Sequence, residues 1–160
     1  MEKQKTLVLV KPDAVEQNII GEIISLLESQ QLKVINMEMK TPGLEQVYCH
    51  YNKVGGLEKR LTEKLGKERA KQVVTQIVAF MTRGKVVALI LEGDNAVERV
   101  RKIVGATEPE KAEDSTIRGI FRHDSSAKAN KEMRALENTV HASASLEEAR
   151  KEIGLWFPSS

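Results

Sequence analysis

The sequence is poor in cysteine, in aromatic residues and in long apolar runs, and each shortage excludes something. Cys49 is the single cysteine, so no internal disulfide can form, which is compatible with a reducing cytosol. The longest aliphatic run, residues 86–91, is far too short to span a membrane. The apolar residues 6–10 near the N-terminus are too few for a secretory signal. We therefore expect a cytoplasmic protein with no membrane partner.

Several well-known types of site are also missing. The sequence contains neither a G-x-x-x-x-G-K-[ST] phosphate loop nor the motif set of protein kinases. Its three histidines, His50, His123 and His141, are not at zinc-binding spacing. Lys and Arg number 25 against 23 Asp and Glu, and a net charge of +2 does not by itself indicate a nucleic-acid partner. An anion site in this chain must therefore use a few well-placed cations.

Short strands and amphipathic helices follow one another along the 160 residues, a length typical of one domain. The apolar runs at 6–10 and 86–91 are typical of strands buried on both faces. Residues 34–40 alternate, with Ile35, Met37 and Met39 on one face, as in a half-buried strand. We expect loops at 53–67, which has one helical piece, and at 105–116. The pattern predicts strands at 6–10, 34–40, 86–91 and 138–143, and helices at 20–27, 44–51, 70–81, 97–104 and 145–153. This order favours an α+β fold in which helices cover one sheet.

Four side chains suggest a weak anion site from position alone. Lys11 directly follows a buried strand, although a solvated lysine is the commoner case there. Arg101 lies on the face of a helix that should be apolar, where it needs a partner unless it extends past the helix edge to water. Arg118 follows a long loop, and a guanidinium fits phosphate oxygens, although most loop arginines are surface charges. His141 has small neighbours that would leave its ring accessible, although a lone histidine in a strand is more often structural.

Five ordered segments together resemble the nucleoside diphosphate kinase family. They read VKPDAV at 10–15, GATEP at 105–109, TIRG at 116–119, NTVHAS at 138–143 and EIGLWF at 152–157. Single matches would be weak, but matches spread from Val10 to Phe157 in the family's order are strong. The resemblance implies a ferredoxin-like sandwich with a four-stranded antiparallel sheet covered by helices, a Mg²⁺-nucleotide substrate such as ATP, and a phosphohistidine intermediate.

The resemblance also implies a role for each matching residue. His141 falls on the nucleophile, Glu152 on the carboxylate that orients its ring, and Ser143 on a hydroxyl near the transferred phosphate. Asn138 falls on the group that bonds the sugar hydroxyl, with Lys11 expected nearby. The phosphate-binding set comprises Lys11, Tyr51, Arg101, Thr107 and Arg118. No protein metal ligand is expected, since the family binds Mg²⁺ through the nucleotide phosphates.

Elementary chemistry agrees with these roles. Neutral imidazole is a competent nucleophile near pH 7. A hydrogen bond from one ring nitrogen of His141 to Glu152 would fix the tautomer and leave the other nitrogen free to attack. Phosphoryl transfer needs positioning and neutralised oxygen charge, which Lys11, Arg101 and Arg118 could supply together with Mg²⁺. A covalent intermediate lets donor and acceptor use one site in turn, giving ping-pong kinetics.

The sequence departs from the family pattern in five places. Val73 falls where the family usually has a phenylalanine that stacks on the base. Segments 52–72 and 122–137 of the single domain are enlarged, and the second is a candidate lid. Ala144 replaces a common aspartate. The sequence ends soon after Phe157, where the family often has a tail that packs on neighbouring subunits, so the size of the expected homo-oligomer (hexamer, tetramer or dimer) stays open.

Two other functions compete with the enzyme. A nucleotide-binding regulator of the same fold with little transfer activity is suggested by Val73 and Ala144, but retention of His141 and Lys11 argues against it. A ferredoxin-like RNA binder needs exposed aromatic residues on its central strands, and residues 6–10 and 86–91 contain none.

Overall fold

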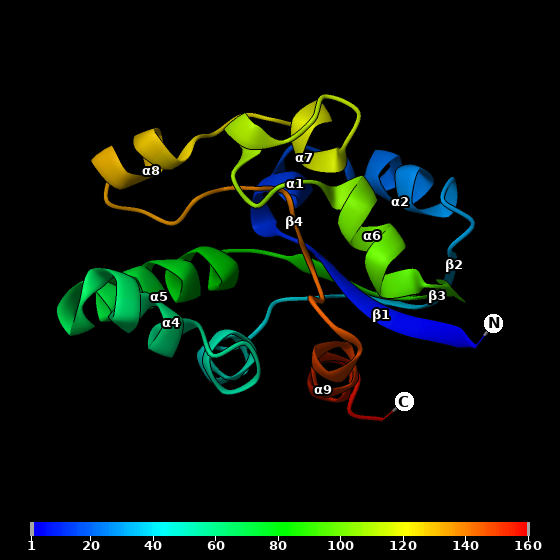
Figure 1. Ribbon diagram of the computed structural model, residues 1–160, viewed down its shortest axis with the longest axis horizontal. Coiled ribbons are helices and arrows are strands. Elements are labelled where there is room, and N and C mark those ends of the chain that lie inside the picture. The colour runs from blue at the N-terminus through cyan, green and yellow to red at the C-terminus, as the bar shows by residue number, and fades with distance from the viewer. Residues whose placement is uncertain (1, 160) are drawn as a thin grey trace.

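The computed structural model describes residues 2–159, and in these a four-stranded antiparallel sheet has helices on both faces (Figure 1). Adjacent strands follow the order β2-β3-β1-β4. The predicted α+β, ferredoxin-like architecture with an antiparallel sheet is therefore confirmed. The strands are β1 (Lys3–Val10), β2 (Lys33–Lys40), β3 (Val86–Asp94) and β4 (Val140–Ala142).

The helices connect these strands and differ greatly in length. Five of them were expected from the sequence, three by apolar periodicity. In chain order they are α1 (Pro12–Glu16), α2 (Ile20–Glu28), α3 (Leu44–Tyr48), the π-helix η1 (Cys49–Val54), α4 (Leu57–Leu65), α5 (Lys67–Thr82), α6 (Ala96–Val104), the 3-10 turn η2 (Pro109–Lys111), α7 (Ile117–Ile120), α8 (Ser126–Lys131) and α9 (Leu146–Trp156).

The central strand β1 is buried on both faces because its alternate side chains enter two separate cores. Val8 and Val10 pack with α2 and α6 on one face of the sheet. Leu7 and Leu9 pack with α5 and α9 on the other face. Continuous apolar sequence is what such a doubly covered strand requires. The sheet is thus a rigid layer, and its strand ends carry the groups described below.

The edge strand β2 differs from its prediction. Ile35, Met37 and Met39 are 38%, 53% and 55% exposed, so the expectation that they form the buried side of a half-buried strand is wrong. A register shift between Val34 and Asn36 interrupts the alternation. Within residues 2–159 the apolar side of this edge therefore faces outward.

Both enlarged segments are more helical than expected. Residues 53–67 fold as the end of η1 followed by α4, so the helical piece expected there takes up most of the predicted loop. α4 carries Leu57, Leu61 and Leu65 four residues apart, a narrow apolar stripe, although none of its residues is classed as buried. Segment 122–137 contains α8, whose N-terminus is capped by the Ser125 hydroxyl. No helix within residues 2–159 is both long and apolar enough to cross a membrane.

Candidate active site

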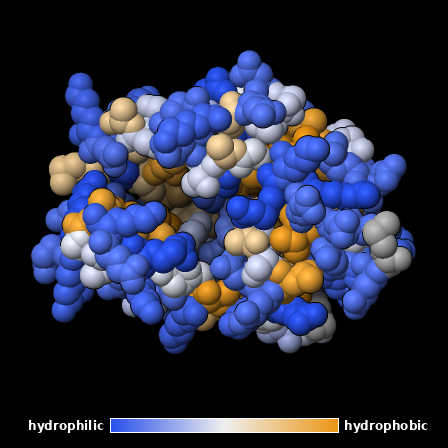
Figure 2. Space-filling view, in the orientation of Figure 1, coloured by the Kyte–Doolittle hydropathy of each residue, from blue (hydrophilic) through white to orange (hydrophobic). Residues whose placement is uncertain are grey.

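A cavity of about 620 Å³ collects nearly all the residues singled out from the sequence. Figure 2 shows the molecule hollowed between α8 and the α4–α5 hairpin. β4 brings its residues to the cavity because it pairs with β1, with His141 opposite Leu9. Ser143 is the exception among the expected residues: it is fully buried and does not line the cavity. Those that do are Lys11, Tyr51, Val73, Arg101, Thr107, Arg118, Asn138, His141 and Glu152.

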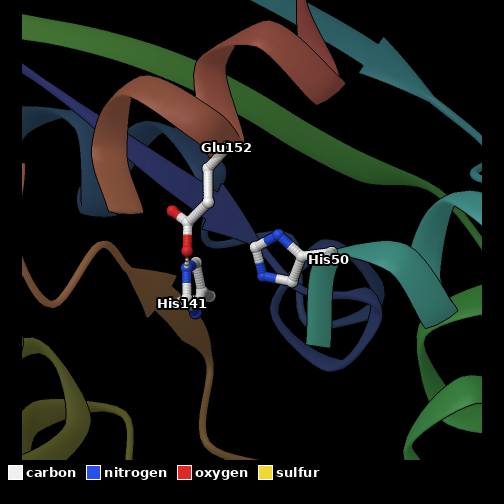
Figure 3. A group of neighbouring side chains, drawn as sticks. All are labelled: His50, His141 and Glu152. Atoms are coloured by element: carbon white, nitrogen blue, oxygen red, sulfur yellow. Dashed lines mark hydrogen bonds and ion pairs between the residues drawn. The ribbon is translucent and has the colours of Figure 1, made fainter. Parts of the chain in front are cut away.

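His141 is oriented by a carboxylate that is itself oriented by a hydroxyl. The His141 Nε2 atom lies 3.0 Å from Glu152 Oε1, as Figure 3 shows. The Ser143 hydroxyl donates to Glu152 Oε2 at 2.6 Å and accepts from the Leu7 backbone N–H at 3.2 Å. A carboxylate only accepts, so the proton of neutral His141 sits on Nε2. Nδ1 therefore keeps a free lone pair.

His141 is held in its neutral, nucleophilic form. Burial lowers its pKa well below the usual value, and the nearby charges of Lys11, Arg118 and Arg101 lower it further. Burial also raises the pKa of Glu152, although His50 and the Ser143 hydroxyl oppose this. A neutral imidazole amid cationic groups is suited to attack an electron-poor centre that carries anionic oxygens.

His50 is a site residue that the sequence reasoning considered only for zinc. Its ring meets the His141 ring edge-on, with centroids 4.4 Å apart and planes at 82° (Figure 3). The Trp156 indole N–H donates to His50 Nδ1 at 3.1 Å, so that nitrogen carries no proton. Burial and His141 lower the pKa of His50 to about 3. Its adjacency to Tyr51 was the available signal, because both follow α3 into the same turn of η1.

Lys11 and Asn138 form one buried unit at the strand ends. Lys11 Nζ donates to Asn138 Oδ1 at 2.7 Å, and Asn138 Nδ2 donates to the Thr107 carbonyl at 2.9 Å. Burial, reinforced by Arg118, lowers the pKa of Lys11 to about 7. A buried ammonium with a single amide partner gains strongly from an anion.

Arg118 has a structural role as well as a place in the cavity wall. It donates to three backbone carbonyls, those of Asn138 at 3.1 Å, Gly105 at 3.1 Å and Val140 at 2.7 Å. These bonds hold the loop at residues 105–107 against the start of β4. The remaining N–H groups of the guanidinium stay available to a ligand. Arg101 is exposed at the cavity rim, and its side chain makes no hydrogen bond or ion pair with any residue between 2 and 159.

The Tyr51 hydroxyl reaches the same cavity without a partner. Its oxygen is buried and forms no hydrogen bond among the described residues. Burial raises the pKa of the phenol, so it remains a neutral O–H donor. Buried donors in proteins nearly always have an acceptor, so the free Tyr51 hydroxyl in the cavity wall indicates that a bound ligand accepts its hydrogen bond.

The other end of the cavity is built by the two enlarged segments and α5, and it carries an apolar patch beside polar groups such as Gln76 and Asn130. Val73, Ile77 and Phe80 lie along one face of α5, and Ala129 and Leu136 approach from segment 122–137. Phe80 was not among the residues singled out from the sequence. Helical spacing from Val73 to Phe80 was the signal that could have found it.

Comparisons with known proteins agree with this geometry. A sequence model of the family "Nucleoside diphosphate kinase" matches residues 4–160. A nucleoside diphosphate kinase of Clostridium perfringens (strain 13 / Type A) is 42% identical over 158 residues, covering 99% of this chain and 94% of the relative. One from Pyrococcus abyssi is 40% identical, covering 98% and 85%.

Two solved structures resemble the whole chain. An NDP kinase from Pyrobaculum aerophilum superposes with a TM-score of 0.89 at 34% identity, covering 98% of this chain and 96% of that one. A nucleoside-diphosphate kinase from Borrelia burgdorferi, a transition state mimic with bound vanadate and ADP, gives 0.86 at 33% identity, covering 97% and 87%.

Proposed function

The chain belongs to the nucleoside diphosphate kinase family, and from this premise we propose that it carries the transferred phosphate on His141. It is a phosphotransferase that acts on nucleoside di- and triphosphates. One observation supports the proposed nucleophile above all: Nε2 of His141 is bonded to Glu152, and Nδ1 is left free in a cationic cavity.

In the first half-reaction, Nδ1 attacks the terminal phosphorus of a nucleoside triphosphate, typically ATP. An N–P bond forms as the bond to the bridging oxygen breaks, and the diphosphate leaves with that electron pair. Glu152 balances the positive charge that develops on the imidazole, because it accepts the Nε2–H hydrogen bond. A second diphosphate then takes the phosphate from the ring by the reverse step.

The cationic side chains supply the electrostatic part of the mechanism. Lys11, Arg118 and Arg101 neutralise charge on the phosphate oxygens, and the Tyr51 hydroxyl donates to one of them. Thr107, in the loop at residues 105–107, contributes to phosphate binding. Asn138 bonds the sugar hydroxyl beside Lys11. Ser143 acts by orienting Glu152, since its short hydrogen bond goes to that carboxylate.

Kinases of this family generally require a divalent cation, and we propose Mg²⁺. The donors at this end of the cavity are ammonium, guanidinium, amide and phenol groups, which suit phosphate oxygens better than a cation. Glu152, a carboxylate of the cavity wall, is already bonded to His141 and Ser143. The nucleotide's own phosphates would therefore hold the ion, which supplies further neutralisation of oxygen charge.

The proposal is tested by exchange kinetics and by a single-turnover label. Rates measured over a grid of ATP and a second diphosphate should give the parallel double-reciprocal lines of a ping-pong reaction. Incubation with γ-labelled ATP alone should leave an acid-labile, alkali-stable label on His141. A protein that binds ADP but acquires no label would instead be the nucleotide-binding regulator.

We also propose a homo-oligomer that covers the open side of β2. The exposed side chains Ile35, Met37 and Met39 lie together on an edge strand, which is a ready template for a second copy. Light scattering on the wild type and on Met37→Lys tests this. A wild-type monomer would contradict it, as would an unchanged mass in the variant.

A further inference from the structure

His123, in the enlarged segment 122–137, sits in an unusual place for a histidine on a loop. Its Nδ1 lies 3.0 Å from the Phe121 carbonyl oxygen. Its Nε2 lies 3.3 Å from Asp13 Oδ2 and 3.9 Å from Glu137 Oε1. Carbonyl and carboxylate oxygens only accept, so both ring nitrogens face acceptors. The ring that satisfies this geometry is the doubly protonated imidazolium.

Asp13, the partner of His123, is a buried carboxylate with a second contact. It is 1% exposed and lies in the first turn of α1, two residues after Lys11. Its Oδ2 also accepts the Thr139 backbone N–H at 2.9 Å. Burial alone would raise the pKa of Asp13, but the hydrogen bond from His123 and the charge of Lys11 lower it. The buried anion is thus stabilised in part by His123.

Thr139, which Asp13 holds, has a strained backbone. Its φ is +76°, a left-handed conformation that a β-branched residue rarely adopts. Asp13 fixes its N–H, and the Lys11 backbone N–H fixes its carbonyl at 2.9 Å. Thr139 separates Asn138, which bonds Lys11, from the strand that carries His141. Relaxation of this one residue would move both neighbours.

We propose that His123 is a positioning residue for phosphoryl transfer: its positive charge holds Asp13, and Asp13 holds strained Thr139, so that Asn138 and His141 keep their places. The enlarged segment thereby becomes part of the transfer machinery without touching the substrate. This inference rests on the proposed function, because the geometry it maintains is that of the nucleophile and of its sugar-binding neighbour.

The charges around this cluster are balanced by side chains from several elements. Arg83, directly after α5, binds both Glu137 and Glu16 of α1, and Arg134 lies 3.8 Å from Glu137. Asp13, His123 and Glu137 also have the composition of a metal site. Both oxygens of Glu137 are already bonded to Arg83, however, and the protonated ring already neutralises Asp13. The hydrogen bond to Asp13 raises the pKa of His123 to about 9, so His123 is positively charged at neutral pH.

The test compares three variants with the wild type by exchange kinetics. His123→Gln removes the charge, His123→Lys restores a cation, and Lys128→Gln removes an exposed cation elsewhere in the same segment as the matched control. At pH 7.5 we expect His123→Gln to lower kcat at least tenfold with KM within threefold, and the other two to stay within threefold of wild type. From pH 8 to 10 the ratio of kcat in His123→Lys to kcat in wild type should rise, because only the wild type loses its cation near pH 9. The titration of Lys11 is common to all four proteins and cancels in such ratios.

Hydrogen exchange at the Thr139 amide gives a readout that needs no activity. Protection should be lost in His123→Gln, be kept in His123→Lys, and fall in wild type as the pH passes about 9. Normal kcat and protection in His123→Gln would overturn the inference, as would equal losses in the Gln and Lys variants. If the wild type transfers no phosphate while hydrogen exchange at Thr139 follows this pattern, the proposed function fails, but the role of His123 in holding Asp13 and Thr139 is supported. If His123→Gln does not fold, the pH response of wild type against His123→Lys still decides.

Discussion

The two ends of the cavity are built on different principles. At the phosphate end, hydrogen bonds fix two pairs of side chains. Lys11 bonds Asn138 at 2.7 Å, and His141 bonds Glu152 at 3.0 Å. At the other end, Val73, Ile77 and Leu136 form an apolar part of the wall, and no hydrogen-bonded unit of this kind joins them. Hydrogen bonds fix direction, whereas apolar contact fixes only shape. Chemistry and most of the affinity should therefore reside at the phosphate end, with little discrimination among bases at the other.

Removing the nucleophile should break the phosphate end most completely. His141→Ala should abolish phosphate exchange between ATP and a second nucleoside diphosphate, because no other group carries the phosphate. The affinity for ADP and the melting temperature should change little, since the small side chain leaves the charged groups in place. Exchange within tenfold of wild type would rule out the phosphohistidine.

Two neighbouring arginines separate phosphate binding from scaffolding. Arg118 and Arg122 each bind backbone carbonyls, Arg122 those of Pro109 and Ala112, so both alanine variants should melt earlier. Only Arg118 lines the cavity. Arg118→Ala should therefore lose about 1.5–3 kcal/mol of ADP affinity, as expected for a charge-assisted contact, and Arg122→Ala much less. Calorimetric affinities that fall equally in both variants would show that Arg118 does not meet the phosphates.

The protonation of Lys11 makes the phosphate end sensitive to pH. Burial and Arg118 hold the pKa of Lys11 at about 7 in the ligand-free protein, and a bound phosphate should raise it. Above pH 7, binding must then take up a proton, so affinity should fall by up to roughly tenfold per pH unit. ADP titrations at pH 8 in buffers of different ionisation enthalpy should reveal this uptake in wild type. If the same proton uptake occurs in Lys11→Met, the proton binds to a group other than Lys11.

Substitution at the apolar end should change nucleotide affinity least. Val73→Phe should tighten ADP binding by about 1 kcal/mol if the new ring stacks on the base. If Val73 is instead a packing residue, the larger side chain should lower stability by roughly 1–3 kcal/mol with unchanged affinity. Affinity and melting temperature of this one variant distinguish the two cases. The second result would remove the base from the neighbourhood of Val73.

The sequence predicted the phosphate end far better than the apolar end. Strands β1 and β3 and helices α2, α5 and α6 carry their own periodicity, and the motifs around Lys11, Arg118 and His141 are local. Residues that act through packing left weaker signals. His50 matters because Trp156 fixes its tautomer from 106 residues away, and such a contact has no local spacing.

The predictions from sequence that were wrong or missing also concern features without a clear local pattern. Residues 53–67 were expected as a loop with one helical piece because the segment is polar and contains Gly55, Gly56 and Gly66, which obscured the i, i+4, i+8 leucines of α4. β2 was expected to bury Ile35, Met37 and Met39, but its position at the sheet edge was not readable from its alternation. The pairing of His123 with Asp13 joins residues in separate elements that only the fold brings together.

A structure with bound Mg²⁺ and a non-hydrolysable ATP analogue tests the division of the cavity most directly. We expect the terminal phosphorus about 3–3.5 Å from Nδ1 of His141, in line for attack, with the phosphates near Lys11 and Arg118 and the base between α5 and α8. A nucleotide bound the other way round, with its base beside His141 and its phosphates between the helices, would contradict the account.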